Sequence, residues 1–335
     1  MAIRLKDIAR DLGVSTVTVS KVLRGNSDIS EKTRERVLKR MREVNYQPNM
    51  LARGLASGRT YTVGLVVPDL VHPFFAEFAK SLSGVLRQSN RALLLASSEE
   101  DAEMEQQEIR TLLSRSVDVL LIASCQPRLM NFYELGDERT PFLLVDRNFP
   151  YLAAHFVGSD DYQAGRLATK HLIDIGKTRI AHIGGRTMSP SLERMRGYRD
   201  MLGEARIESP EKYIVTLERF EETGDTVGYQ AMKSLLKLKP RPDAVFCYND
   251  MTAIGAMEAA TEAGLRIPED IAFIGCGNLR YDRYLRMPLS SIDQNSDALG
   301  TKAGELAIEL ANNATLPPKS VLLEPKLVIR QSTTA

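Results

Sequence analysis

The residues of this sequence most suited to binding a ligand are polar side chains that directly follow apolar segments. They lie in four residue pairs: Pro68-Asp69, Asp146-Arg147, Asn249-Asp250 and Gly277-Asn278. Carboxylates, amides and guanidinium groups bind polar ligands through hydrogen bonds and ion pairs. In open α/β sheets, ligands bind outside the carboxyl ends of the strands. If the apolar segments are strands, these pairs predict a ligand-binding site at the strand ends.

The motifs of common enzymes on such folds are missing. There is no G-x-G-x-x-G after an apolar segment, no Walker loop and no G-x-S-x-G. The acids Asp160-Asp161 precede an amphipathic stretch, where they suit the start of a helix. The four histidines show no spacing for metal ligation; they are His72, His155, His171 and His182. We therefore expect a protein that is not an enzyme, with no cofactor and no metal site.

Eight apolar segments alternate with amphipathic stretches after residue 61. Strands that are apolar throughout and alternate with helices predict parallel sheets covered on both faces, here two α/β subdomains. The segments are residues 62–67, 92–97, 117–124, 141–146, 179–185, 213–217, 243–250 and 271–277.

The stretch GVSTVTVSKVL (13–23) is predicted to be a helix rather than a strand. Val19, Val22 and Leu23 recur at helical spacing, and Ser15 is a favourable N-cap. The remaining face carries Lys21 and short side chains, which allow close approach to a groove. The stretch therefore predicts a nucleic-acid recognition helix.

Helices on either side of this stretch complete a helix-turn-helix unit. The first has apolar residues at i, i+3, i+4 and i+7 from Leu5 and stops at Gly13. The third follows the cap Ser30, and its apolar side is formed by Val37, Leu38, Met41 and Val44.

Charge separates the first part of the chain from the rest. The net charge is +1, but residues 1–60 contain 13 Lys and Arg against 6 Asp and Glu, and the remainder contains 31 against 37. A basic head on an acidic body favours a polyanionic partner for the head, although a solvated charged helix is an alternative explanation.

Cysteine placement and hydropathy indicate the compartment. Cys125, Cys247 and Cys276 lie inside apolar runs without paired spacing and predict buried thiols in a reducing environment. No apolar run approaches the ~18 residues of a membrane span, and MAIRLKDIARDLG has no signal core. We expect a cytoplasmic protein without membrane contact.

The head from IRLKDIARDLG to PNMLARGLASGRT resembles the DNA-binding region of the lactose/galactose repressor family of bacterial transcription factors. The body from TVGLVVPDLVHPFFAE to LVIRQST resembles that family's periplasmic-binding-protein-like core. The resemblance implies an all-α headpiece (1–46), a hinge helix and linker (47–60) and a core of two doubly wound parallel-sheet subdomains (61–335). It places the N-subdomain at about 61–161 and 293–321, and the C-subdomain at about 162–292 and 322–331.

The resemblance implies a nucleoid-associated homodimer that reads a pseudo-palindromic operator. Thr16, Val17 and Lys21 then face the bases, where lysine can bond guanine and the methyl groups suit thymine. Phosphate contacts are expected from Ser15, Thr18, Ser20 and Asn26. In the hinge, Asn49, Ala52 and Arg53 match the family pattern, and Leu55 matches the leucine that enters the minor groove.

The resemblance also implies a small sugar-like effector in the core. The positions carried over from the family are Asp69, His72, Phe74, Phe75, Asp146, Arg147, Arg194, Phe220, Asn249, Gly277 and Gln294. Gly277 stands where the family usually has an acid. With that acid missing, Arg147 and Arg194 would face less negative charge, which points to an effector with a carboxylate or phosphate, such as a sugar acid. A neutral sugar stays the commoner alternative, because Asp69 and Asp146 could still balance the arginines.

Several functional alternatives remain open. The effector could release the protein from DNA or act as a co-repressor, and a phosphorylated carrier protein could be the co-regulator. A transport-type sugar-binding protein shares the core fold but has no DNA-binding head. A dimer is expected because no leucine-heptad extension follows LVIRQST.

Replacement of Leu55 by alanine should weaken operator binding more than is usual in such proteins. Gly54 stands where the family usually has serine and makes a hinge helix less stable by about 1 kcal/mol relative to alanine, so the bound hinge relies more on the leucine wedge. A gel-shift titration measures the effect. Equal binding by the wild type and Leu55→Ala would contradict the assignment of the wedge.

Overall fold

The computed structural model describes residues 3–23, 26–46, 58–127, 140–185, 187–208, 210–216 and 224–334. The chain divides into two compact units, Met1–Thr60 and Tyr61–Ala335. The hinge positions Asn49, Ala52, Arg53 and Leu55 and the core position Phe220 lie outside the described residues.

The described part of the first unit contains the three predicted headpiece helices: α1 (Leu5–Leu12), α2 (Thr16–Leu23) and α3 (Glu31–Glu43). Gly13 ends α1 with a left-handed φ of 65°, which glycine adopts without steric cost. Ser15 caps α2, because its Oγ accepts a hydrogen bond from the Thr18 amide at 3.0 Å. Ser30 caps α3 in the same way through the Thr33 amide.

A small apolar core joins the three helices. It contains Ile8, Ala9, Val19, Val22, Val37 and Met41. The prediction for Leu38 was wrong, because this side chain is 39% exposed while Val37 beside it is fully buried. On α2 the same packing leaves Val17 58% exposed, so the predicted recognition face is open to solvent.

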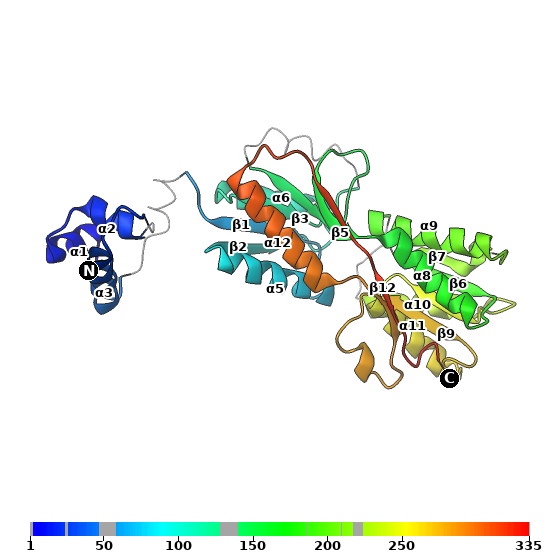
Figure 1. The fold of residues 1–335 in the computed structure, drawn as a ribbon. Helices are drawn as coiled ribbons and strands as arrows, with labels where there is room; N and C mark the ends of the chain where they lie inside the picture. The colour runs from blue at the N-terminus through cyan, green and yellow to red at the C-terminus, as the bar shows by residue number, and fades with distance from the viewer. Residues whose placement is uncertain are drawn as a thin grey trace. The chain divides into compact units, whose positions relative to one another are not determined.

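The second unit contains two α/β subdomains, each with a six-stranded sheet (Figure 1). The N-terminal sheet has the strand order β11-β5-β4-β3-β1-β2, and all its neighbouring pairs are parallel. Its strands are β1 (Thr62–Val67), β2 (Ala92–Ser97), β3 (Val119–Ile122), β4 (Phe142–Val145), β5 (His155–Ser159) and β11 (Ser320–Leu323).

The C-terminal sheet has the order β12-β10-β9-β8-β6-β7, in which only β12 runs antiparallel to its neighbour. Its strands are β6 (Ile180–Gly184), β7 (Ile214–Thr216), β8 (Ala244–Cys247), β9 (Ala272–Cys276), β10 (Ser290–Asp293) and β12 (Lys326–Val328). The eight predicted strand segments are all confirmed, whereas β5, β10, β11 and β12 were not predicted.

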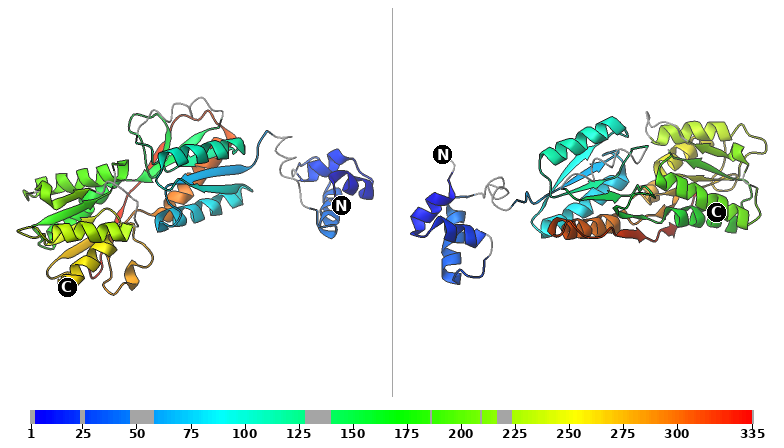
Figure 2. Two further views of the ribbon diagram at one scale, coloured as in Figure 1. Left: turned by 180° about the vertical axis from the view of Figure 1, so that it is seen from behind. Right: turned by 90° about the horizontal axis from the view of Figure 1, so that it is seen from above.

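Helices cover both faces of each sheet (Figures 1 and 2). In the N-terminal sheet, Leu65 packs with α5 and α12, whereas the next residue, Val66, packs with α6 on the opposite face. In the other sheet, Val245 packs with α10 and α11, and Phe246 packs with the opposite layer of α8 and α9. The helices are α5 (Pro73–Gln88), α6 (Ala102–Ser114), α8 (Asp161–Asp174), α9 (Ser189–Glu204), α10 (Gly224–Leu235), α11 (Asp250–Glu262) and α12 (Ser296–Asn312).

The chain passes between the two sheets three times: between β5 and α8, between β10 and α12, and between β11 and β12. The third passage lies later than the expected boundary at residue 321. The reason is that Leu322 and Leu323 still pair with β5 of the N-terminal sheet. All three cysteines are buried free thiols, and no described helix is long and apolar enough to cross a membrane.

Helices α8 and α9 touch through glycine. A Cβ added to Gly165 would lie 2.2 Å from the carbonyl oxygen of Arg194, and one added to Gly197 would lie 2.2 Å from that of Tyr162. Both distances are far below van der Waals contact with backbone, which cannot move aside cheaply. The helix pair therefore requires glycine at both positions.

Replacement of Gly165 by alanine should destabilise the protein by about 1–3 kcal/mol through overpacking. Gly203, near the end of α9, provides the matched control, since nothing lies within 4 Å of its Cβ position. Gly203→Ala should stabilise the protein by up to about 1 kcal/mol, because alanine favours the helix. Urea unfolding followed by circular dichroism measures both, and equal effects of the two substitutions would contradict the packing argument.

Candidate functional site

A cavity of about 380 Å³ lies between the two subdomains, where strands of both sheets end. Its size is ordinary for a small-molecule site. Of the sequence-predicted positions, nine line it: Asp69, His72, Phe74, Phe75, Asp146, Arg147, Arg194, Asn249 and Gln294. Gly277 does not line it, although its neighbour Cys276 does.

Arg147 is neutralised within the N-terminal subdomain. Its two terminal nitrogens bind the Glu100 carboxylate at 3.0 and 2.6 Å in a bidentate pair. Glu100 follows β2 in the segment ASSEE. It could therefore have been predicted as a polar residue at a strand end, but the prediction omitted it. The Nε atom of Arg147 is buried and has no hydrogen-bond partner among the residues that the structure describes.

Arg194 is neutralised within the C-terminal subdomain. Its Nε and one terminal nitrogen lie 2.8 and 2.7 Å from Asp161 Oδ1, and the other terminal nitrogen donates to the carbonyl oxygen of Tyr248 at 2.6 Å. The guanidinium also lies 4.9 Å from the centre of the Tyr248 ring. The prediction had placed Asp161 at a helix start, which is correct, but had not connected it with Arg194.

The expectation that the two arginines face too little negative charge was therefore wrong. Each already pairs with a carboxylate, the half-buried Glu100 in one subdomain and the buried Asp161 in the other. Asp69 and Asp146 also line the cavity, so its excess charge is negative rather than positive. The inference of an anionic effector from Gly277 loses its physical basis.

Asp146 is a buried carboxyl of the cavity without a close partner. No described residue donates a hydrogen bond to it, and Arg147 Nε stands 4.0 Å from its Oδ2. Burial, and then the negative charge of Asp161, raise the pKa of Asp146 to about 7. A hydroxyl group placed between these two atoms could accept from Arg147 Nε and donate to the ionised carboxylate.

His72 and Asn249 face each other across the cavity. Asn249 caps α11 by accepting a hydrogen bond from the Thr252 amide at 2.8 Å, and its Nδ2 lies 3.3 Å from His72 Nε2. Burial lowers the pKa of His72 to about 4, so the ring is neutral, and its Nδ1 is buried without a partner. These groups leave hydrogen-bonding capacity for an uncharged polar ligand.

The two phenylalanines contribute less to the cavity than expected. Phe74 and Phe75 are about 95% buried in the N-terminal core and pack edge-to-face on each other. Only their margins reach the cavity, because both side chains are held in the layer between α5 and the sheet.

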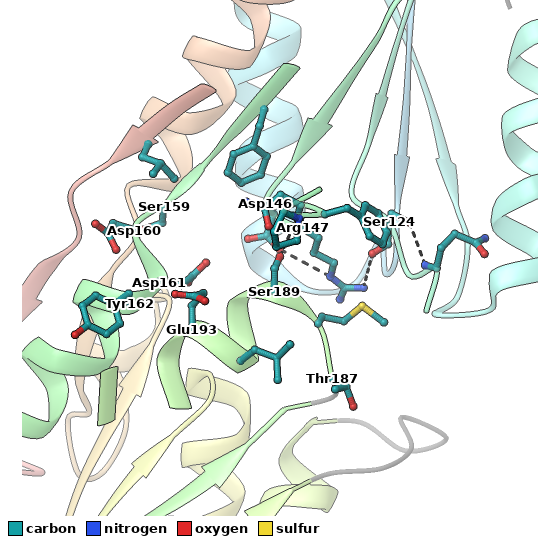
Figure 3. A pocket seen from close by; sticks show the side chains of 18 of the residues that line it. Ser124, Asp146, Arg147, Ser159, Asp160, Asp161, Tyr162, Thr187, Ser189 and Glu193 are labelled. Atoms are coloured by element: carbon teal, nitrogen blue, oxygen red, sulfur yellow. Dashed lines mark hydrogen bonds and ion pairs between the residues drawn. The ribbon is translucent and has the colours of Figure 1, made fainter. Parts of the chain in front are cut away.

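A second cavity of about 350 Å³ is also lined by Asp146 and Arg147 (Figure 3). Thr187 in the loop before α9 and Ser189 at the first position of α9 line this cavity, and the Ser189 hydroxyl accepts a hydrogen bond from the Asn148 amide at 2.8 Å. Asp160 and Asp161 line this cavity at the first passage between the sheets. Asp146 and Arg147 thus form a wall that both cavities share.

On α2, Thr16 and Val17 are exposed, and Thr18, Ser20 and Lys21 are half-buried. Lys21 Nζ forms an ion pair with Asp28, which lowers the pKa of that carboxyl. Asn26 is exposed in the following loop. Within the described ranges, no group of three or more possible metal ligands occurs.

Comparisons with known proteins agree with this architecture. The family model "Bacterial regulatory proteins, lacI family" matches residues 4–49, and "Periplasmic binding protein-like domain" matches residues 169–333. The ribose operon repressor of Haemophilus influenzae is 36% identical, covering 98% of each chain. The regulator GalR of Escherichia coli is 33% identical, covering 98% of this chain and 95% of that protein.

Two solved structures extend the comparison. The lac repressor dimer bound to operator and the anti-inducer ONPF has a TM-score of 0.86 at 25% identity, with complete coverage of both chains. The regulator CelR in complex with cellobiose has a TM-score of 0.74 at 29% identity, covering 98% of this chain and 99% of that chain.

Replacement of Asp161 by asparagine should destabilise the core by about 3–5 kcal/mol, because it leaves the buried Arg194 charge uncompensated. Asp174 on the same helix is the control, since its ion pair with Lys170 is exposed, and Asp174→Asn should change stability by less than about 1 kcal/mol. Urea unfolding of both variants measures the difference. Similar losses would show that the Arg194 pair is not a determinant of the fold.

Proposed function

Because the chain belongs to the lacI family of bacterial regulatory proteins, we propose that it is a transcriptional repressor that binds operator DNA as a homodimer and responds to a small effector. The observation that carries this proposal is the combination of an open recognition face on α2 with a ligand-sized cavity between two hinged subdomains. The relatives named above are repressors or regulators over the same full length.

The DNA-reading role is assigned to α2. Thr16 and Val17 present methyl groups that suit thymine, and Lys21 can bond guanine once it leaves Asp28. Ser15, Thr18, Ser20 and Asn26 lie next to this face and would contact phosphates. Leu55 in the hinge would enter the minor groove, and Asn49, Ala52 and Arg53 would support it.

We assign a neutral, polyhydroxyl sugar as the effector rather than an anionic one. The paired arginines have no free charge to offer a carboxylate or phosphate. The unpaired atoms of the cavity, Arg147 Nε, His72 Nδ1 and the Asp146 carboxyl, match the donor and acceptor capacity of hydroxyl groups. Asn249 of the C-terminal subdomain and Gln294, in the passage between β10 and α12, would add amide contacts.

The response to the effector would follow from the three passages between the sheets. A ligand that touches both walls of the cavity binds better to one arrangement of the subdomains than to the other. That preference would be coupled to the spacing of the two DNA-binding heads of a dimer, at a typical coupling energy of ~1–3 kcal/mol. Relief of repression is the outcome we propose.

The experiment selects operator fragments from random duplex DNA with the full chain and then adds sugars to the complex in a gel shift. Lys21→Ala should bind the selected fragments at least tenfold more weakly, whereas Lys302→Ala, an exposed lysine of α12, should bind them normally. Neutral sugars should release the DNA, and sugar acids and sugar phosphates should not.

The outcomes separate the parts of the proposal. Failure to select any sequence would overturn the assignment as a DNA-binding regulator. Release by an anionic sugar alone would leave that assignment standing and would instead show that Arg147 or Arg194 changes partner on binding.

A further inference from the structure

Two carboxyl groups, those of Asp250 and Asp282, are buried together behind the wall of the ligand cavity. Asp250 is 1% exposed and Asp282 is 0% exposed. Asp250 accepts hydrogen bonds from the Ser291 hydroxyl at 2.6 Å and from the Leu279 amide at 3.1 Å. No donor among the described residues reaches either oxygen of Asp282. The Asp282 amide donates to the Leu279 carbonyl oxygen at 3.0 Å, so this buried carboxyl lies in the same turn that Asp250 holds, and a buried carboxyl without a donor is stable only when it is protonated.

The surrounding charges balance only if one carboxyl is protonated. Arg330 is the cation that acts on the pair, but its terminal nitrogen stands 4.0 Å from Asp282 Oδ2. The guanidinium donates instead to the Leu289 carbonyl oxygen at 2.7 Å and to Asn278 Oδ1 at 2.5 Å. Two ionised carboxylates beside one guanidinium would leave a buried negative charge, which is expensive. One shared proton makes the cluster neutral.

The other titratable groups around the pair do not alter this balance at neutral pH. Burial raises the pKa of Tyr281 to about 12 and raises the pKa of the Cys247 and Cys276 thiols, so all three remain neutral. Asp225 on α10 and Glu77 on α5 act on Tyr281, and Asp293 on β10 accepts from Asn278 Nδ2 at 3.1 Å.

The pair lies directly behind residues that line the cavity. Asn249 and Met251 flank Asp250 in sequence, and Cys276 precedes the turn that Asp250 holds through the Leu279 amide. A Cβ at Gly277 would lie 2.9 Å from Asp250 Oδ2. Gly277 also has a φ of 138°, so any side chain at this position would strain the backbone as well as crowd Asp250.

We propose that Asp282 is a positioning residue for the ligand cavity: it shares one proton with Asp250, and the protonated pair holds the turn 277–279 against the cavity wall. The pair makes no contact with the ligand. Asp282 affects the cavity through Asp250, which directly follows the wall residue Asn249 in the chain.

This arrangement makes the stability of the core depend on pH. Burial, and next the charge of Asp250, raise the pKa of Asp282 to about 9, well above that of an aspartate in the unfolded chain. The folded state therefore holds a proton that the unfolded state releases. The stabilisation is fully present below about pH 4 and is lost as the pH rises toward 9. One proton changes the unfolding equilibrium constant by up to tenfold per pH unit in that window.

The experiment compares urea unfolding of the full chain with that of Asp282→Asn at several pH values from about 6 to about 9. Asparagine imitates the protonated carboxyl. The unfolding equilibrium constant of this variant should therefore change by up to tenfold less per pH unit than that of the wild type, and the variant should be the more stable protein at about pH 9. Glu269→Gln, at an exposed acid of the same subdomain, should keep the wild-type dependence. Hydrogen exchange of residues 276–286, corrected for its intrinsic pH dependence, should accelerate in alkali only in the wild type and Glu269→Gln.

An unchanged pH dependence in Asp282→Asn would overturn the proposal. If that variant does not fold, Asp282→Ala provides the same comparison without a hydrogen-bonding side chain. The wild type also provides a direct measurement: its infrared spectrum should contain the carbonyl band of a protonated carboxylic acid at neutral pH. Absence of that band would equally overturn the shared proton.

Discussion

The close contact between helices α8 and α9 determines where the charges of the ligand cavity lie. Gly165 and Gly197 allow the two backbones to touch, and this brings Arg194 beside Asp161 at the start of α8. The same guanidinium reaches the Tyr248 carbonyl oxygen after β8. One buried arginine thus ties two helices to a strand end, and the chemistry of the cavity depends on backbone packing that no ligand touches.

The strongest charged interactions beside the cavity lie within the subdomains. Arg147 and Glu100 form a pair within one subdomain, and Arg194 and Asp161 form a pair within the other. Across the cavity, the bond between Asn249 and His72 is long, at 3.3 Å, and involves a neutral ring, whereas the Asn148 amide donates to the Ser189 hydroxyl at 2.8 Å beside the second cavity. A ligand that bonds to both walls can therefore bind one arrangement of the subdomains better than another.

The sequence was sufficient to predict the strands and helices whose apolar residues form a continuous run or recur at helical spacing. The eight predicted strands are buried through their length, or pair beside strands that are, and the headpiece helices repeat at 3.6 residues. The strands that were not predicted lack a long apolar run or lie at a sheet edge: β5 (HFVGS) and β10 (SSID) are buried but contain polar residues or glycine, and β11 and β12 are half-exposed edge strands. Their positions after predicted strands correctly placed Asp69, Asp146 and Asn249 at the cavity. The prediction succeeded because ligand sites in parallel sheets generally lie at the carboxyl ends of the strands.

The charge of the cavity could not be predicted from one motif, because neutralising partners come from distant parts of the chain. Glu100 lies 47 residues from Arg147, and Asp161 lies 33 residues from Arg194. Counting a missing acid at Gly277 therefore said nothing about the balance around the arginines. The acids near Gly277 are Asp250 and Asp282, and their shared burial beside Arg330 favours a proton over a second negative charge. What decides the ionisation of each group is its set of neighbours in the folded protein, together with its access to water.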